Sequence, residues 1–176
     1  VYKRQGVVDA NTVEADSKAD GSWSDTAGRV CAVMTADCLP VLICNREGSK
    51  VAAAHAGWRG LHAGVISSAV SRLNIAADQL LVWLGPAIGP QAFEVGAEVM
   101  HAFVEKDRRN AVAFRQTDAQ HWLCDIYKLA RNELDGLGIG AVYGGDECTY
   151  TDAARFYSYR RDGDTGRMAS LIWLQN

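Results

Sequence analysis

Apolar residues are spaced along this chain in a way that predicts a mixture of strands and helices. Residues 6–27 are largely polar and predict only a short strand near Val7 and Val8. Beyond them, short β-branched runs alternate with segments of helical periodicity. The predicted strands are 30–35, 39–44, 50–54, 80–84, 139–143, 156–159 and 168–174. The predicted helices are 60–73, 98–106 and 125–137.

Turn signals indicate how these elements connect. The turn sequence Asn45-Arg46-Glu47-Gly48 predicts a β-hairpin between strands 39–44 and 50–54, and the charged segment 161–166 predicts a second hairpin between the last two strands. Strands and helices do not alternate strictly. We therefore expect one α+β domain over residues 1–176, with mixed or antiparallel sheets flanked by helices.

Composition narrows the class of protein. With 176 residues, 48% hydrophobic and 22% charged, the chain is long enough to bury a core and is not disordered. A net charge of −3 gives no basic field for nucleic acid. No apolar run reaches membrane-spanning length and no signal peptide is recognisable, so we expect no membrane partner and a cytoplasmic location. Five cysteines without a CxxC pair indicate free thiols in a reducing compartment.

Common catalytic motifs are absent from the sequence. Residues 136–141 fit the loose pattern GxGxxA, but they follow a predicted helix and precede a strand, the reverse of a dinucleotide site. There is no P-loop, GxSxG, HExxH or zinc-deaminase signature. Four histidines without an HxH pair are too few for a conventional multicopper laccase.

Two short segments at the first predicted hairpin remain as candidates for chemistry: TADCLP at 35–40 and HAGWRG at 55–60. If residues 45–48 form the loop, Cys44 faces Ser49 and Cys38 lies opposite His55, with Cβ atoms about 4.5–5.5 Å apart. Either residue alone is commonly a buried structural side chain. Their pairing favours a site.

A thiol beside an imidazole suits two chemistries: two ligands of a zinc ion, or a nucleophile with its general base. Arg59, between two glycines at a helix start, predicts a site for an anion such as phosphate, although a solvated surface role is an equal alternative. Arg160 and Arg161, after an aromatic run, have the same two interpretations.

Four ordered motifs extend this picture. They are TADCLPVL (35–42), HAGWRGL (55–61), LGPAIGPQAFEVG (84–96) and CTYTDAARFYSYRRDGDTGRMAS (148–170). Together they resemble the bacterial YfiH family, whose members are variously called laccase-domain proteins, polyphenol oxidases, peptidoglycan editing factors and purine nucleoside phosphorylases. The resemblance covers nearly everything from about residue 19 onward.

The resemblance implies an α+β fold similar to cysteine hydrolases of the cytotoxic-necrotizing-factor type, and a zinc ion held by one Cys and two His beside a nucleoside and phosphate pocket. The family's Cys ligand matches Cys38 and one His ligand matches His55. Its other His belongs to a QVHG motif, and Gln5 stands where that His would fall. The family's N-terminal third is also missing, so we expect a truncated member with weakened metal affinity.

The resemblance further implies a zinc-dependent purine nucleoside phosphorylase acting on adenosine, inosine, guanosine or methylthioadenosine, with adenosine deaminase side activity. In this interpretation Cys38 and His55 hold zinc, and Arg59, Arg160 and Arg161 hold phosphate. The alternatives are a Cys38–His55 amidase that edits peptidoglycan precursors, a copper-dependent polyphenol oxidase and a catalytically silent domain. We expect a monomer whose partners are the nucleoside and phosphate alone.

Overall fold

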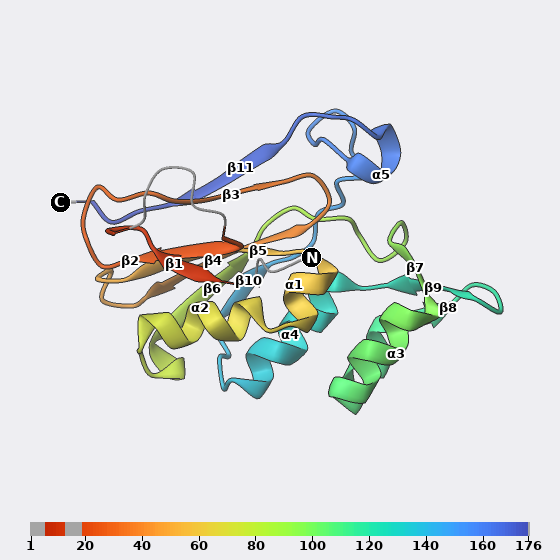
Figure 1. Ribbon diagram of the computed structural model, residues 1–176, viewed down its shortest axis with the longest axis horizontal. Helices are drawn as coiled ribbons and strands as arrows, with labels where there is room; N and C mark the ends of the chain where they lie inside the picture. The colour runs from red at the N-terminus through yellow and green to blue at the C-terminus, as the bar shows by residue number, and fades with distance from the viewer. Residues whose placement is uncertain (1–5, 13–18, 176) are drawn as a thin grey trace.

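The computed structural model describes residues 6–12 and 19–175, and its central feature is a six-stranded mixed sheet (Figure 1). The strands lie in the order β1-β2-β5-β4-β6-β10. They are β1 (Val7–Asp9), β2 (Gly21–Ser24), β5 (Val51–Ala56), β4 (Leu39–Asn45), β6 (Leu80–Leu84) and β10 (Val142–Gly144). The outermost pairs, β1 with β2 and β6 with β10, are parallel, and the inner pairs are antiparallel.

Two smaller sheets accompany this central one. Strand β3 (Cys31–Thr35) pairs antiparallel with β11 (Met168–Ile172) to form a ribbon. The ribbon packs over β4 and β5, and Cys31, Val33 and Ala53 are buried between the two layers (Figure 1). The third sheet has the order β7-β9-β8 and consists of Glu94–Gly96 (β7), His121–Cys124 (β9) and Phe114–Gln116 (β8).

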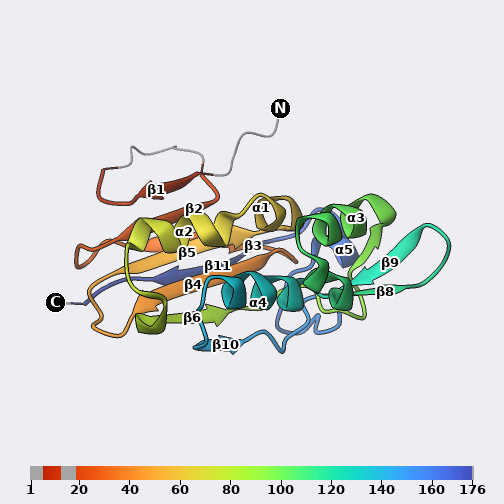
Figure 2. The ribbon, with the colours of Figure 1, turned by 90° about the horizontal axis from the view of Figure 1, so that it is seen from below.

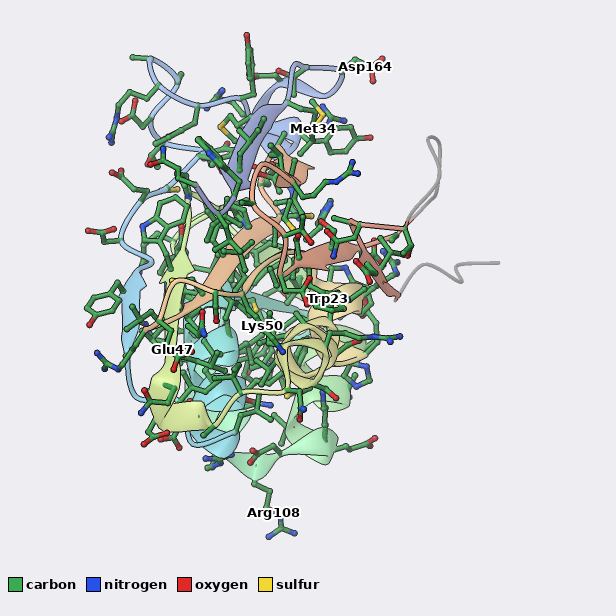
Figure 3. The ribbon with its side chains drawn as sticks, turned by 90° about the vertical axis from the view of Figure 1, so that its left-hand side faces the viewer. Trp23, Met34, Glu47, Lys50, Arg108 and Asp164 are labelled. Atoms are coloured by element: carbon green, nitrogen blue, oxygen red, sulfur yellow. The ribbon has the colours of Figure 1, made fainter. Side chains whose placement is uncertain are left out.

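Helices α1 (Trp58–His62), α2 (Val65–Leu73) and α4 (Ile126–Gly136) cover the opposite face of the central sheet (Figure 2). Helix α3 (Ala97–Lys106) lies beside the third sheet, and α5 (Tyr159–Asp162) lies on the side of the ribbon (Figure 1). The structure also has short 3-10 turns, η1 (Ala77–Gln79) and η2 (Arg108–Ala113). Helix α2 packs on β5 and β2 and against α4, and the main core unites buried apolar side chains of these helices with those of β4, β5 and β6. In Figure 3, Met34 on the ribbon and Arg108 on the helical side mark opposite sides of the molecule. Among the described residues, no helix has the length and apolar character needed to cross a membrane.

The predicted α+β class with mixed sheets is confirmed, and several predicted elements need correction. The helix predicted over 60–73 is interrupted at Gly64, whose φ of 87° leaves the helical region. The strand predicted over 156–159, and hence the second hairpin, is wrong. Ser158 instead caps α5 by accepting a hydrogen bond from the Arg161 backbone N–H, and β11 pairs with β3. Strand β2 and the β7-β9-β8 sheet were not predicted.

Candidate active site

The β4–β5 hairpin has a register two residues away from the predicted one. Pro40 lies opposite His55, and Cys44 lies opposite Val51 rather than Ser49. Asn45 explains the difference, because its backbone N–H bonds to the Lys50 carbonyl at 3.2 Å and moves the loop to residues 46–49. The direct pairing predicted for Cys38 and His55 is therefore wrong. Side chains alternate between the two faces of a sheet, so a register shift of two residues keeps Cys38 on the same face as His55.

Cys38 and His55 nevertheless converge, and Gly57 is the residue over which they meet. A Cβ atom placed on Gly57 would lie 2.9 Å from the Cys38 Sγ and 3.9 Å from the His55 Nε2. The sulfur and the ring nitrogen are therefore at most about 7 Å apart. Both residues are half-buried. The structure thus brings together the two side chains that the sequence singled out, diagonally rather than directly across the strands.

Asp37 holds the turn that presents Cys38. It is buried, and it has a φ of 87° although it is not glycine. One carboxylate oxygen accepts a hydrogen bond from the Thr149 hydroxyl at 2.6 Å, and the other accepts one from the Arg160 backbone N–H at 2.7 Å. The Asp37 carbonyl accepts a further bond from Ile88. Three segments distant in sequence are therefore tied to the residue that precedes Cys38.

Burial sets the protonation of the candidate pair. It raises the pKa of Cys38 to about 11, with the negative charges of Asp37 and Asp20 acting in the same direction and Arg167 opposing them. Burial also lowers the pKa of His55, against a smaller opposing effect of Asp20. At neutral pH the thiol and the imidazole are thus both uncharged. This state is unlike the thiolate–imidazolium pair of an activated cysteine nucleophile.

The donor set fits part of a zinc site. A thiol sulfur and an imidazole nitrogen are preferred zinc ligands, and a bound cation would offset the cost of ionising a buried thiol. Within residues 6–12 and 19–175, no group of three or more His, Cys, Asp or Glu side chains could hold a metal ion. Gln5, which the resemblance noted above aligns with the third ligand, lies outside the described residues.

The three arginines predicted to bind phosphate have different surroundings. Arg59 is exposed on α1, with its guanidinium 4.3 Å from the Trp58 ring centroid. The exposed side chain of Arg160 donates one hydrogen bond to the Glu94 carbonyl at 3.0 Å. Because the backbone N–H of Arg160 binds Asp37, this residue is connected directly to the turn that precedes Cys38.

Arg161 instead has a structural position. Its Nη1 donates to the carbonyls of Thr149 and Tyr150. Its Nη2 donates to the Phe156 carbonyl and to Asp162, and its Nε donates to Asp162 as well. All five guanidinium N–H groups are thereby matched to protein acceptors. A phosphate could be held by Arg161 only if it displaced one of these partners.

The sequence did not single out Asp37, Arg167 or the lowered pKa of Cys148. Asp37 and Arg167 both lie within motifs already noted; Asp37 acts on Cys38 as its neighbour in the chain, whereas the effect of Arg167 depends on long-range packing. Burial of Cys148 raises its pKa, but hydrogen bonds from Thr151, Gly89 and Tyr150 outweigh burial and lower it overall. One of these bonds joins the Gly89 N–H to the Cys148 sulfur at 3.2 Å.

Comparison with known proteins shows the family to which this chain belongs. The profile of the family described as "multi-copper polyphenol oxidoreductase laccase" matches residues 3–175. The chain is 58% identical over 160 residues to a protein of Escherichia coli named purine nucleoside phosphorylase YfiH, covering 91% of this chain and 65% of that protein. It is 56% identical over 169 residues to a Pseudomonas aeruginosa protein named purine nucleoside phosphorylase, covering 93% of this chain and 70% of that one. The chain belongs to the laccase-domain, or YfiH, family.

A crystal structure supports the same assignment. A Neisseria meningitidis protein matches with a TM-score of 0.95 at 48% identity, over 98% of this chain and 72% of that one. As a YfiH-family member, the chain thus has the family's fold along the part that it shares with these relatives. It spans 65% of the length of the Escherichia coli relative.

Proposed function

We propose that this chain supplies active-site residues of a zinc-dependent purine nucleoside phosphorylase. The observation that carries the proposal is the convergence of Cys38 Sγ and His55 Nε2 over Gly57. It is joined by membership of a family in which relatives up to 58% identical are named purine nucleoside phosphorylases. Adenosine, inosine, guanosine and methylthioadenosine are the proposed substrates, and adenosine deamination is a proposed side activity.

Phosphorolysis requires that a phosphate oxygen bonds to C1′ of the ribose while the C–N bond to the purine breaks. The electron pair of that bond leaves with the base, which takes up a proton. Cys38 and His55 would hold zinc, which when bound supplies a Lewis acid that polarises an oxygen ligand. The Arg59 and Arg160 guanidinium groups attract and orient the phosphate anion. Asp37 fixes the position of Cys38 through its hydrogen bonds to Thr149 and Arg160.

The protonation states favour this function over the amidase alternative. A Cys–His amidase needs a thiolate, whereas burial raises the pKa of Cys38 to about 11. A bound metal ion displaces the proton of a thiol ligand, which is released to solvent, so a raised pKa is compatible with this role. Copper-dependent phenol oxidation is in keeping with the name of the matched family and is the alternative proposal for the same two ligands. Zinc is the proposed cofactor because phosphorolysis calls for a Lewis acid and no change of oxidation state.

The test is phosphorolysis of inosine, measured as release of hypoxanthine and ribose 1-phosphate. We expect release by this chain carrying zinc, and a loss of at least about 100-fold in Cys38→Ala and His55→Ala, because each variant removes one of the two proposed ligands. Cys44→Ala, a change at another half-buried thiol, is the matched control and should keep its activity. Activity retained in Cys38→Ala, or none in the unaltered chain even after fusion to the N-terminal segment of the Escherichia coli relative, would contradict the proposal.

A further inference from the structure

A cavity lies beside the candidate site, between the β3–β11 ribbon and the central sheet. It encloses about 260 Å³, and neither Cys38 nor His55 is among its lining residues. Its walls come from the end of β3 and the start of β11, from β4 and β6, and from two loops. The residues used in the argument are Thr35, Pro40, Trp83, Pro86, Phe156 and Met168.

Trp83 forms an aromatic wall of this cavity. Its ring lies beside Gly85 and Gly144, where added Cβ atoms would come within 2.6 Å and 2.9 Å of it. Two glycines thus allow the indole to lie against the backbone, and 41% of this large apolar residue remains exposed. Phe156, Met168 and two prolines complete an apolar lining. Such a surface favours a flat, uncharged ring over a polar or branched molecule.

Thr35 supplies an unmatched polar group at the same place. The residue is only 2% exposed, and its hydroxyl is the sole buried side-chain polar atom without a hydrogen-bond partner among the described residues. A buried hydroxyl without a partner is unfavourable, and such groups are rare in folded proteins. Thr35 is one of the residues that line the cavity, so a guest bound there lies next to this residue. A guest with one N–H or O–H group would then satisfy it.

The nearby charges argue against an anionic guest. Of the residues that the structure describes, Arg155 is the only charged one that lines the cavity, and its guanidinium lies 4.8 Å from the Phe156 ring centroid. That group is already bonded to both carboxylate oxygens of Glu147 and to Asp152. Its charge is therefore balanced within the protein. No unmatched cation remains on this wall to offset the burial of a carboxylate or a phosphate.

We propose that this cavity is a binding site for an uncharged aromatic ring that carries one hydrogen-bonding N–H or O–H group. The ring stacks on Trp83 and contacts Phe156, and its polar group bonds to the Thr35 hydroxyl. The site does not depend on the proposed metal or on phosphorolysis. It adjoins the candidate active site, because Thr35 precedes Cys38 by three residues and Pro40 pairs with His55.

Indole is the probe that fits this description, and its binding is measured by amide and indole N–H chemical shifts in two-dimensional NMR spectra. We expect chemical-shift changes at Trp83, Thr35 and Ser170, which all line the cavity. The indole N–H signal of Trp83 is identified by its absence from the spectrum of Trp83→Phe. Benzothiophene has nearly the same shape without the N–H, and should bind about tenfold more weakly, which corresponds to the loss of one hydrogen bond. Indole-3-carboxylate and hypoxanthine should also bind more weakly, because their additional polar groups lack partners in the cavity.

Thr35→Val removes the hydroxyl with little change in shape, so this variant should fold and bind indole about tenfold more weakly. Thr35→Ser keeps the hydroxyl and should retain binding, and Thr117→Val on the surface should leave it unchanged. Dispersed spectra of each variant confirm that it is folded. The proposal is overturned if indole shifts no signal around the cavity, if benzothiophene or hypoxanthine binds as tightly as indole, or if Thr35→Val binds indole like the unaltered protein.

Discussion

At the scale of single residues, the candidate site depends on a few side chains whose partners lie far away in the sequence. Asp37 adopts a φ of 87°, a conformation that costs free energy for a residue other than glycine. The bonds of its carboxylate to Thr149 and to the Arg160 backbone offset that cost. The unfavourable backbone conformation thus occurs at the residue that directly precedes Cys38 and sets its position relative to His55.

Replacing Asp37 with asparagine tests this role. Asn tolerates the same backbone conformation, but its amide nitrogen cannot accept a hydrogen bond, so we expect a loss of about 1–2 kcal/mol in the free energy of unfolding. Loss of the negative charge should also lower the pKa of Cys38, since Asp37 contributes to raising it. The rate of Cys38 alkylation as a function of pH, followed by mass spectrometry, measures that shift. The exposed Asp118→Asn is the control, and an unchanged profile for Asp37→Asn would refute the role.

Gly57 offers a second test at a single residue. Its φ of −67° suits any amino acid, so the need for glycine comes only from the 2.9 Å approach of the Cys38 sulfur. We expect Gly57→Ala to destabilise the protein by about 1–3 kcal/mol and to weaken zinc binding, because the sulfur must move. Urea unfolding and competition with a chromophoric chelator measure the two effects.

The matched control is Gly140→Ala, where an added Cβ would meet nothing within 4 Å. That variant should change neither stability nor zinc binding appreciably. Equal effects at the two glycines would show that the sulfur does not constrain position 57.

At the scale of secondary structure, Asn45 determines where the hairpin turns. Its side-chain oxygen accepts hydrogen bonds from the backbone N–H groups of Ser49 and Lys50, and its amide donates to the Ser49 hydroxyl. We expect Asn45→Ala to lower the free energy of unfolding by about 2 kcal/mol, because it removes three partly buried hydrogen bonds. Thermal or urea unfolding measures the loss. Exposed Glu47 in the same loop is the control, and Glu47→Ala should change stability by less than about 0.5 kcal/mol.

The strands and helices with strong hydrophobic periodicity could be predicted from the sequence, and the register could not. Helix α4 follows the predicted pattern, and Asp125 caps it by accepting the Lys128 N–H. The hairpin register was wrong because residues 45–48 look like a complete turn. The Asn45 N–H instead bonds to the Lys50 carbonyl, which adds Asn45 to the first strand and leaves Ser49 in the loop. The β7-β9-β8 sheet was missed because each of its strands has only three or four residues.

At the scale of the whole molecule, the sequence predicted that Cys38 and His55 lie close together, but not how they are held. Cys38 and His55 meet because both lie on one face of a single hairpin, which is a local relation. Asp37, Thr149 and Arg160 meet through contacts across more than 100 residues, and no local pattern encodes them. The internal role of Arg161 was hidden for a different reason, because three of its acceptors are backbone carbonyls, which every residue carries. Zinc, the monomeric state, the cytoplasmic location, the single domain and the likeness to cysteine hydrolases stay predictions.

Zinc binding should couple the site to the stability of the whole protein in a pH-dependent way. With a pKa near 11, the Cys38 thiol must lose a proton when it binds a metal, whereas the lowered pKa of His55 leaves its ring already neutral above about pH 7. Apparent zinc affinity should therefore rise about tenfold per pH unit from neutrality toward about pH 9. Chelator competition measures it, and the zinc-induced increase in melting temperature should follow the same trend.

Three variants separate the contributions to that pH dependence. His55→Ala should weaken affinity but keep the slope, because the thiol still releases its proton. Cys38→Ala should weaken affinity and also flatten the slope, since the titrating ligand is gone. Cys44→Ala removes a different half-buried thiol and should change neither. If the slope survives in Cys38→Ala, the proton comes from another group and Cys38 is not the ligand; if affinity is independent of pH in the unaltered protein, zinc binds elsewhere on the molecule.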